Sequence, residues 1–240
     1  MSVRGYETKG GGHMYVAAIL ISMNTAAVWI LVTFVRGVFG GRLVVGLRSA
    51  RIRMVLDGIL TLPLVLPPTV AGFFLLYIFG VKRPVGQFFL DYFGVKIAFS
   101  WSATVIAAVV ISFPLMYRSA RGAFEQVDRN MVDAARTLGM PEGRIFWRVV
   151  MPMALPGVAS GGVLSFARGL GEFGATAMIA GNFAGKTRTL PRAVYSAVAA
   201  GNMESAYGYV AIIVAISFIV VVAMNYFTMQ ENRRGRKAKP

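Results

Sequence analysis

The chain has 240 residues, of which 56% are hydrophobic and only 15% are charged. It contains no cysteine, so disulfides, iron–sulfur clusters and thiolate metal sites are excluded. The single histidine, His13, argues against a zinc enzyme, because the usual motif needs two histidines one helical turn apart. The net charge is +15, and the hydrophobic residues fall in long blocks, which is typical of a membrane protein.

Hydrophobic blocks of about 20 residues are long enough to cross the roughly 30 Å core of a bilayer as helices. We therefore predict an all-α integral membrane protein with one polytopic domain and about five transmembrane helices. The first helix has room to extend to about residue 45, because arginines near its end can snorkel to the membrane surface. The predicted spans are residues 14–35, 56–78, 98–117, 155–180 and 207–227.

Lysine and arginine are distributed unequally between the two sets of loops, with 16 on one side and 8 on the other. The positive-inside rule then places the N-terminus outside and the C-terminus in the cytoplasm. Because these charges flank membrane segments and form no separate basic domain, we expect no nucleic-acid partner. The predicted parts are an external tail (1–13), a transmembrane domain (14–228) and a basic cytoplasmic tail (229–240).

The longest charged loop, residues 118–156, has a helical pattern of charges. Glu125, Arg129 and Asp133 recur every four residues, a spacing that puts opposite charges on one helix face. Asp128 as N-cap and Gly139 as C-terminal glycine predict a helix over about residues 129–138. On this pattern alone, the loop is equally well a solvated helical hairpin between two spans.

Three prolines divide the rest of this loop. Pro141 suits the first turn of a second helix, and we expect Pro152 and Pro156 to interrupt that helix.

The segment Asp-Ala-Ala-Arg-Thr-Leu-Gly, residues 133–139, followed by the Leu-Pro that ends at Pro156, resembles the EAA loop of ABC importer permeases. Asp133 stands where that family usually has glutamate. The resemblance implies an ABC type I importer permease fold and a coupling helix that docks in a groove of a cytoplasmic ATPase. The implied coupling residues are Asp133, Ala134, Ala135, Arg136, Gly139 and Pro156.

Nucleotide chemistry is expected on that other polypeptide. This chain has no Gly-x-x-x-x-Gly-Lys-Ser/Thr motif, so we expect it to bind no cofactor, with ATP and Mg on the partner ATPase. It also lacks a nucleophile–base or metal constellation, so we expect a transport subunit and not an enzyme.

Two predicted spans carry residues that are unusual inside a membrane. Arg168 and Glu172 are four residues apart, so on one helix they can pair and offset part of their desolvation. Three prolines in the second span predict a kinked or broken helix. In both places, a structural role and a role in the transport pathway remain open. The pathway or gate candidates are Pro63, Pro67, Pro68, Thr69, Arg168, Glu172, Phe173 and Thr176.

Three stretches, residues 60–70, 169–176 and 187–191, are similar to the molybdate-importer permeases. That resemblance implies a homodimer in a prokaryotic plasma (inner) membrane, with ABC ATPase subunits below, an extracytoplasmic substrate-binding protein above, and alternating access driven by ATP. Sulfate and tungstate permeases are the related alternatives. From another class, the alternative is an ion-gradient-driven transporter or channel that uses Arg168 and Glu172 as a relay.

Basic residues in the predicted outer loops fit more than one role. They can raise the local concentration of a dianion. They also fit a role as solvated loop charges or as docking contacts for a partner. These residues are Lys82, Arg83, Lys186, Arg188 and Arg192.

Overall fold

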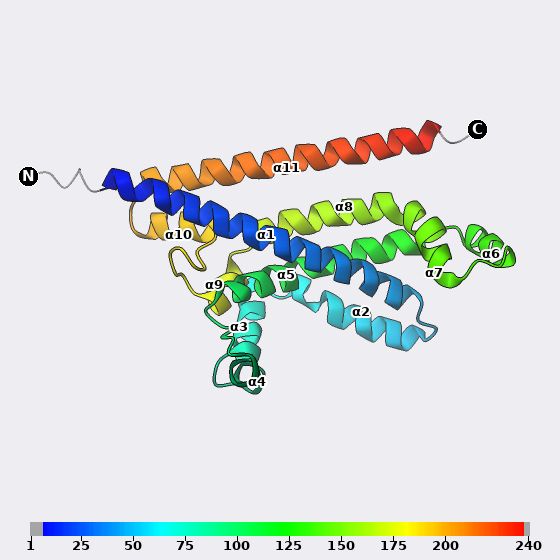
Figure 1. The fold of residues 1–240 in the computed structure, drawn as a ribbon, viewed down its shortest axis with the longest axis horizontal. Helices are drawn as coiled ribbons and strands as arrows, with labels where there is room; N and C mark the ends of the chain where they lie inside the picture. Colours follow the sequence, from blue (N-terminus) through cyan, green and yellow to red (C-terminus); the bar gives the residue numbers. More distant parts are fainter. Residues whose placement is uncertain (1–6, 238–240) are drawn as a thin grey trace, which may run out of the picture.

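The computed structural model describes residues 7–237, and this range contains helices and loops but no β-strand. The longest helices run along the long axis of the molecule, and shorter ones gather at its two ends (Figure 1). The helices are α1 (Glu7–Val45), α2 (Ala50–Val65), α3 (Pro68–Phe79), α4 (Pro84–Phe93), α5 (Trp101–Glu125), α6 (Arg129–Thr137), α7 (Glu142–Ile145), a π-helical turn (Phe146–Val150), α8 (Met151–Leu170), α9 (Gly174–Ala180), α10 (Leu190–Ala199) and α11 (Met203–Lys237).

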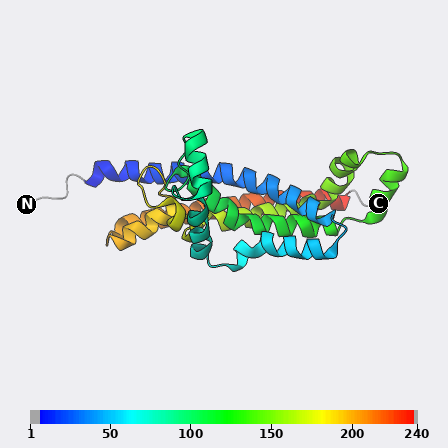
Figure 2. The ribbon, with the colours of Figure 1, turned by 90° about the horizontal axis from the view of Figure 1, so that it is seen from below.

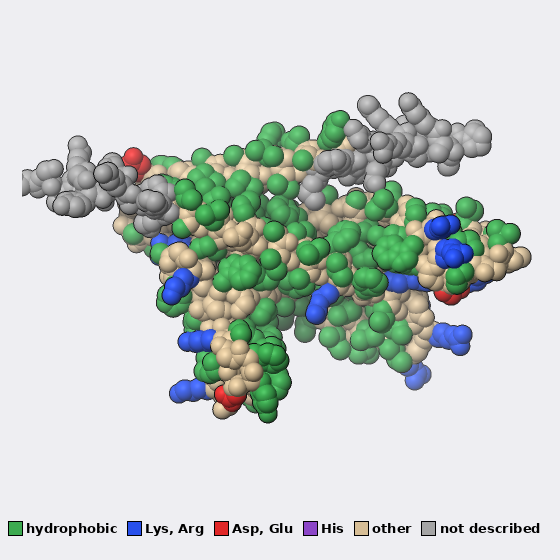
Figure 3. All heavy atoms as spheres, in the orientation of Figure 1, with side chains coloured by type: hydrophobic (Ala, Val, Ile, Leu, Met, Phe, Trp, Pro, Cys, Tyr) green, Lys and Arg blue, Asp and Glu red, His purple; other side chains and the backbone are tan. Residues whose placement is uncertain are grey.

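Four helices in the described range are long and apolar enough to cross a membrane, and α2 with α3 makes a fifth span if the bent pair is counted as one. The all-α membrane fold predicted from the sequence is therefore confirmed. Hydrophobic side chains cover much of the long face in Figure 3, while Lys and Arg lie mainly toward its ends. The four long spans are Tyr15–Val45, Trp101–Glu125, Glu142–Leu170 and Met203–Ala223.

Several helices are longer than the hydrophobic blocks from which we predicted them. Helix α1 continues to Val45, the longer of the two limits considered, and it begins at Glu7, inside the stretch predicted as a tail. Helix α5 begins at Trp101 and continues to Glu125, beyond the predicted end at residue 117. Helix α11 continues to Lys237, so the predicted basic tail is largely a continuation of this helix.

The second span is broken, as its prolines predict. Helix α2 ends at Val65, and Leu66 is extended with φ −68° and ψ 140°, because a residue before proline is disfavoured in the helical region. Pro68 then occupies the first turn of α3, where its missing N–H leaves no intrahelical bond unmade. The two helix axes differ by 112°.

The fourth predicted span, residues 155–180, is wrong at its start and in its interior. Pro152 and Pro156 do not interrupt the helix that follows Pro141, since α7, the π-helical turn and α8 follow one another without a break. The N–H of Met151 bonds to the Phe146 carbonyl five residues back, and this wider π-helical turn stands directly before Pro152. Helix α8 instead ends at Leu170, and residues 171–173 separate it from α9.

Helix α5 lies between α1 and α8, and these three helices run side by side in both ribbon views (Figures 1 and 2). Small hydroxyl side chains join them in the interior. Thr33 and Ser112 share a hydrogen bond of 3.3 Å, and the Ser165 hydroxyl donates to the Ser112 carbonyl at 3.1 Å. Such hydrogen bonds between membrane helices stabilise their association where water offers no alternative partner.

Candidate functional site

Helix α6 lies at one end of the molecule, beside α7 (Figure 1). Asp128 caps it by accepting a hydrogen bond from the Asn130 N–H at 2.9 Å. Gly139 follows it with φ +74°, a left-handed conformation that favours glycine. The predicted cap, helix and terminal glycine are confirmed, with the helix ending at Thr137.

Helix α6 has an inner and an outer apolar face. Ala135 is only 6% exposed and packs in a cluster with Ile145, Phe146 and Val150. On the outside, Met131, Ala134 and Leu138 are exposed, and their spacing of three and four residues places them on one face. We call these three residues the outer stripe. Leu138 is 82% exposed.

Met131 and Leu138 were not predicted from the sequence. The available signal was a pair of large apolar residues seven positions apart, which helical geometry places on one face.

Charged side chains fix α6 to α7. Arg136 donates from Nε to Glu142 Oε1 at 2.6 Å and from Nη1 to Asp133 Oδ1 at 2.9 Å. The hydrogen bond to Glu142, and to a smaller extent the one to Asp133, raises the pKa of Arg136 above its usual value. The predicted Glu125–Arg129 face is wrong, because Glu125 ends α5 and Arg129 begins α6. In the described residues Glu125 pairs instead with Arg121 at 3.0 Å.

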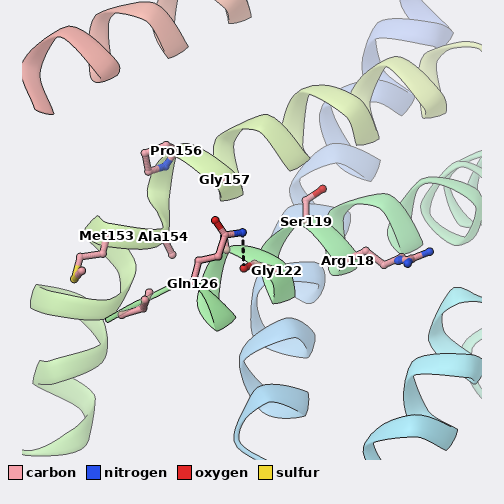
Figure 4. Close-up of a pocket in the computed structure, with 10 residues that line it drawn as sticks. Arg118, Ser119, Gly122, Gln126, Met153, Ala154, Pro156 and Gly157 are labelled. Atoms are coloured by element: carbon pink, nitrogen blue, oxygen red, sulfur yellow. Dashed lines mark hydrogen bonds between the residues drawn. The ribbon is translucent and has the colours of Figure 1, made fainter. Parts of the chain in front are cut away.

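Pro156 lies apart from the other predicted coupling residues. It lines a cavity of about 500 Å³ between α5 and the start of α8, to which α6 contributes no side chain (Figure 4). Arg118 and Ser119 line the same cavity, and the Gln126 amide donates to the Gly122 carbonyl at 3.1 Å.

At the other end of α8, the predicted pair forms, but across a helix break. Arg168 Nη1 donates to Glu172 Oε2 at 3.0 Å, while the N–H of Ala175 donates to Glu172 Oε1 at 2.7 Å. Glu172 therefore stands outside both helices and caps α9, which corrects the prediction of one continuous helix. Its exposed fraction is 4%, whereas the Arg168 side chain is 32% exposed.

The broken second span packs directly against this break. A Cβ on Gly174 would lie 2.8 Å from Pro68 Cβ and 3.3 Å from the Thr69 nitrogen, so only glycine allows this approach. The structure thus brings the α2–α3 and α8–α9 breaks together. Of the predicted pathway residues, Pro67, Glu172 and Phe173 lie in these two breaks, Pro68 and Thr69 begin α3 beside them, and Pro63 lies inside α2.

A small cavity of about 20 Å³ lies beside Glu172. Thr104, Thr176 and Thr189 are among the residues that line it, and Thr176 is fully buried. A space of this size suits about one water molecule, and the surrounding groups supply the polar partners that a buried water needs. Among the described residues, no group of three or more His, Asp or Glu side chains is arranged to hold a metal ion.

One of the predicted loop charges is not in solvent. Arg192, on the first turn of α10, is 8% exposed, and its guanidinium carbon lies 5.8 Å from the centre of the Phe173 ring. The sequence analysis missed this burial because Arg192 lies in a segment with several other basic residues. Of the other members of that set, Lys82, Arg83 and Lys186 are exposed, and Arg188 is half-buried.

Comparison with known proteins agrees with this architecture. Residues 37–235 match the family described as the binding-protein-dependent transport system inner membrane component. The molybdenum transport system permease protein ModB of Escherichia coli K12 is 40% identical over 91% of this chain and 96% of its own length. The putative molybdenum transport system permease protein YvgM of Bacillus subtilis 168 is 41% identical, over 85% of this chain and 89% of the relative.

Solved structures share the fold at lower sequence identity. A chain of the inward-facing MetNI methionine ABC transporter superimposes with a TM-score of 0.71 at 17% identity, covering 91% of this chain and 96% of that one. A chain of a bacterial alginate ABC transporter gives 0.76 at 12% identity, with coverage of 90% and 79%. This chain therefore belongs to the binding-protein-dependent transport system inner membrane components, the permease subunits of ABC importers that the loop around Asp133 resembles.

Proposed function

We propose that the chain moves molybdate inward across the membrane by alternating access. Two copies would form the pathway, a separate ATPase would bind ATP and Mg, and an extracytoplasmic binding protein would deliver the anion. The choice of molybdate rests on the names of the relatives that are 40% and 41% identical over most of this chain. Tungstate and sulfate, which are similar dianions, are the alternatives.

The observation that carries this proposal is the outer stripe of α6. Three apolar side chains are exposed together on a short helix at the end of the bundle, outside the apolar spans. Exposed apolar patches rimmed by charge are typical of protein docking sites. An ATPase groove explains the stripe, whereas a channel or gradient-driven carrier has no use for it.

The helices suggest how movement of α6 would reach the pathway. Arg136 and Glu142 tie α6 to α7, and α7 continues through the π-helical turn into α8. Helix α8 ends at the break that packs on Pro68 and Thr69. A shift of α6 on ATP binding would therefore move α8 as a lever. The two adjoining breaks would act as hinges, since hinges are short segments at the ends of regular elements.

The direction of the helices supports the proposed orientation. Helix α1 begins at the end of the molecule opposite to α6, and α11 ends at the same end as α6 (Figure 1). If α6 faces the ATPase in the cytoplasm, the C-terminus is cytoplasmic and the N-terminus is external.

The test is reconstitution of the chain with its ATPase and binding protein in liposomes. We expect ATP-dependent uptake of radiolabelled molybdate that unlabelled tungstate inhibits strongly and sulfate weakly. Stronger inhibition by sulfate than by unlabelled molybdate would assign a different anion. Uptake driven by an ion gradient without ATP would contradict the proposal as a whole.

A further inference from the structure

Arg192 is a buried positive charge without a counter-charge. Its Nε and Nη1 atoms are shielded from solvent and have no hydrogen-bond partner in the described residues. The other arginine near a helix break, Arg168, shows the usual arrangement, because Glu172 neutralises it. No ion pair of this kind involves Arg192 in the part of the chain that the structure describes.

The charged neighbour of Arg192 is another cation, and no acid of the described residues forms an ion pair with Arg192. Burial, followed by the charge of Arg188, lowers the pKa of Arg192. Arginine nevertheless keeps its proton in proteins, so the guanidinium remains charged. Arg188 is held toward α10 because its Nε donates to Asn182 Oδ1 at 2.9 Å, and the Asn182 amide donates to the Ser196 hydroxyl at 2.8 Å. Two cations are thus fixed close together.

Such an arrangement is costly for the protein alone. An unpaired buried charge destabilises a fold, and an apolar residue of similar size would avoid that cost. The buried Thr189 hydroxyl, three residues earlier, also has no partner in the described residues, but it belongs to the small cavity beside Glu172 and needs no anion to satisfy it. The unpartnered guanidinium donors of Arg192 are suited to an acceptor that comes from outside the chain. A guanidinium binds a tetrahedral oxyanion well because it donates two parallel hydrogen bonds.

An aromatic ring lies over the guanidinium of Arg192. The ring is that of Phe173, in the α8–α9 break, and its centre lies 5.1 Å from the ring centre of Tyr195. Tyr195 is exposed, so Phe173 lies between the buried cation and an aromatic ring at the surface. Phe173 belongs to the break that the proposed lever would move.

Resting on the proposed function, we infer that Arg192 is an oxyanion-binding residue of the permease itself. It would contact the translocated dianion when movement of the α8–α9 break carries Phe173 off the guanidinium. The binding protein would then not be the only component that recognises the anion.

The experiment uses the complete permease–ATPase complex with Arg192→Gln, Arg192→Lys and the control Arg83→Gln. Arg83 is a matched control because it too lies against an aromatic ring, 3.9 Å from the centre of Tyr77, but is exposed. Two quantities are measured, the Tm of the complex with and without added molybdate in the absence of the binding protein, and the uptake of molybdate in its presence.

We expect the Arg192→Gln complex to be at least as thermally stable as the wild type, because an unpaired charge has been removed. Its molybdate-dependent rise in Tm should disappear, and uptake should fall about tenfold or more, as expected for loss of a charged hydrogen bond. Arg192→Lys should keep part of the molybdate-dependent rise in Tm and part of the uptake, and Arg83→Gln should keep both in full.

Normal uptake by Arg192→Gln would overturn the inference. So would a complex that falls apart with Gln but transports normally with Lys, because Arg192 would then pair with the second copy of the chain. If the wild type transports no molybdate, the proposed function fails. Tm measurements with tungstate and sulfate would in that case still decide whether Arg192 binds an oxyanion.

Discussion

Arg136 and Glu142 link two successive helices through a pair of parallel hydrogen bonds, Nε to Oε1 at 2.6 Å and Nη2 to Oε2 at 3.2 Å. Both side chains are exposed, so the pair has little value for overall stability. Its geometry instead fixes the angle between α6 and α7, because bidentate arginine–carboxylate pairs are directional.

We predict that Glu142→Gln leaves the Tm of the complex unchanged but lowers the uptake that each hydrolysed ATP supports. A loosened α6 would transmit only part of the ATPase movement. The measurement is the ratio of anion uptake to ATP hydrolysis in liposomes. The reversed pair, Arg136→Glu with Glu142→Arg, should recover part of the ratio, and an unaltered ratio in Glu142→Gln would exclude this role.

The outer stripe gives a second prediction. Leu138→Glu should prevent assembly with the ATPase, because it places a charge in the apolar contact, while the chain still inserts and folds. Copurification of the ATPase measures this, with Thr137→Glu, exposed and outside the stripe, as the control. Ala135→Glu is unsuitable, since Ala135 is buried against Phe146 and its replacement would disturb folding. Normal copurification of the ATPase with the Leu138→Glu variant would show that the outer stripe does not contact the ATPase.

The contact between the α2–α3 and α8–α9 breaks gives a third prediction. Gly174→Ala should lower stability by about 1–3 kcal/mol, because the new methyl group overlaps Pro68. Gly171→Ala is the control, since a Cβ there would meet nothing closer than the Ala167 carbonyl oxygen at 4.0 Å. Thermal unfolding of the assembled complex measures the difference. Equal Tm values for the two variants would show that the breaks do not pack as described.

The features that the sequence predicted correctly are those set by neighbouring residues. Pro67 and Pro68 break a helix through their own rings, and Asp128 caps the helix that follows it. Pro152 and Pro156 misled the prediction, because a π-helical turn before them allows the helix to continue, and that turn has no simple sequence signal. The burial of Arg192 was not predicted either, since it reflects contact with Phe173, which lies far from it in the sequence, in the α8–α9 break.

The ion pair between Arg168 and Glu172 gives a fourth prediction, because the two side chains differ in how deeply they are buried. Arg168→Gln leaves the buried Glu172 carboxylate with one hydrogen bond among the described residues, from Ala175, and should cost about 3 kcal/mol or more. Glu172→Gln should cost less, because Arg168 is partly exposed and the amide oxygen can still cap α9. The double variant should recover stability.

Thermal unfolding of the complexes with the two single variants and the double variant tests this order of stability. Anion uptake by the same complexes shows whether the pair also has a role in transport. A stable double variant that transports normally would leave the pair a structural role only. Equal stability of both single variants and the wild type would contradict the pairing itself.

The last prediction concerns the bent pair, α2 and α3, which decides on which sides of the membrane the termini lie. Helix α1 ends near the α6 end of the molecule, whereas α5 begins beyond the middle, beside α3 and α9 (Figure 1). Only α2, α3 and α4 lie between these two points in the chain. We therefore expect the bent pair, with its 112° bend, to form one span that crosses the membrane.

We expect a cysteine at Lys9 and one at Lys239 to lie on opposite sides of the membrane. The chain has no cysteine, so each introduced thiol is the only label site. A membrane-impermeant thiol reagent added to intact cells or spheroplasts should label Lys9→Cys and the outer-loop control Tyr92→Cys. It should label Lys239→Cys and the α6 control Thr137→Cys only after permeabilisation. Labelling of Lys9→Cys and Lys239→Cys from the same side would mean an even number of crossings, and α2 with α3 would then form a re-entrant hairpin.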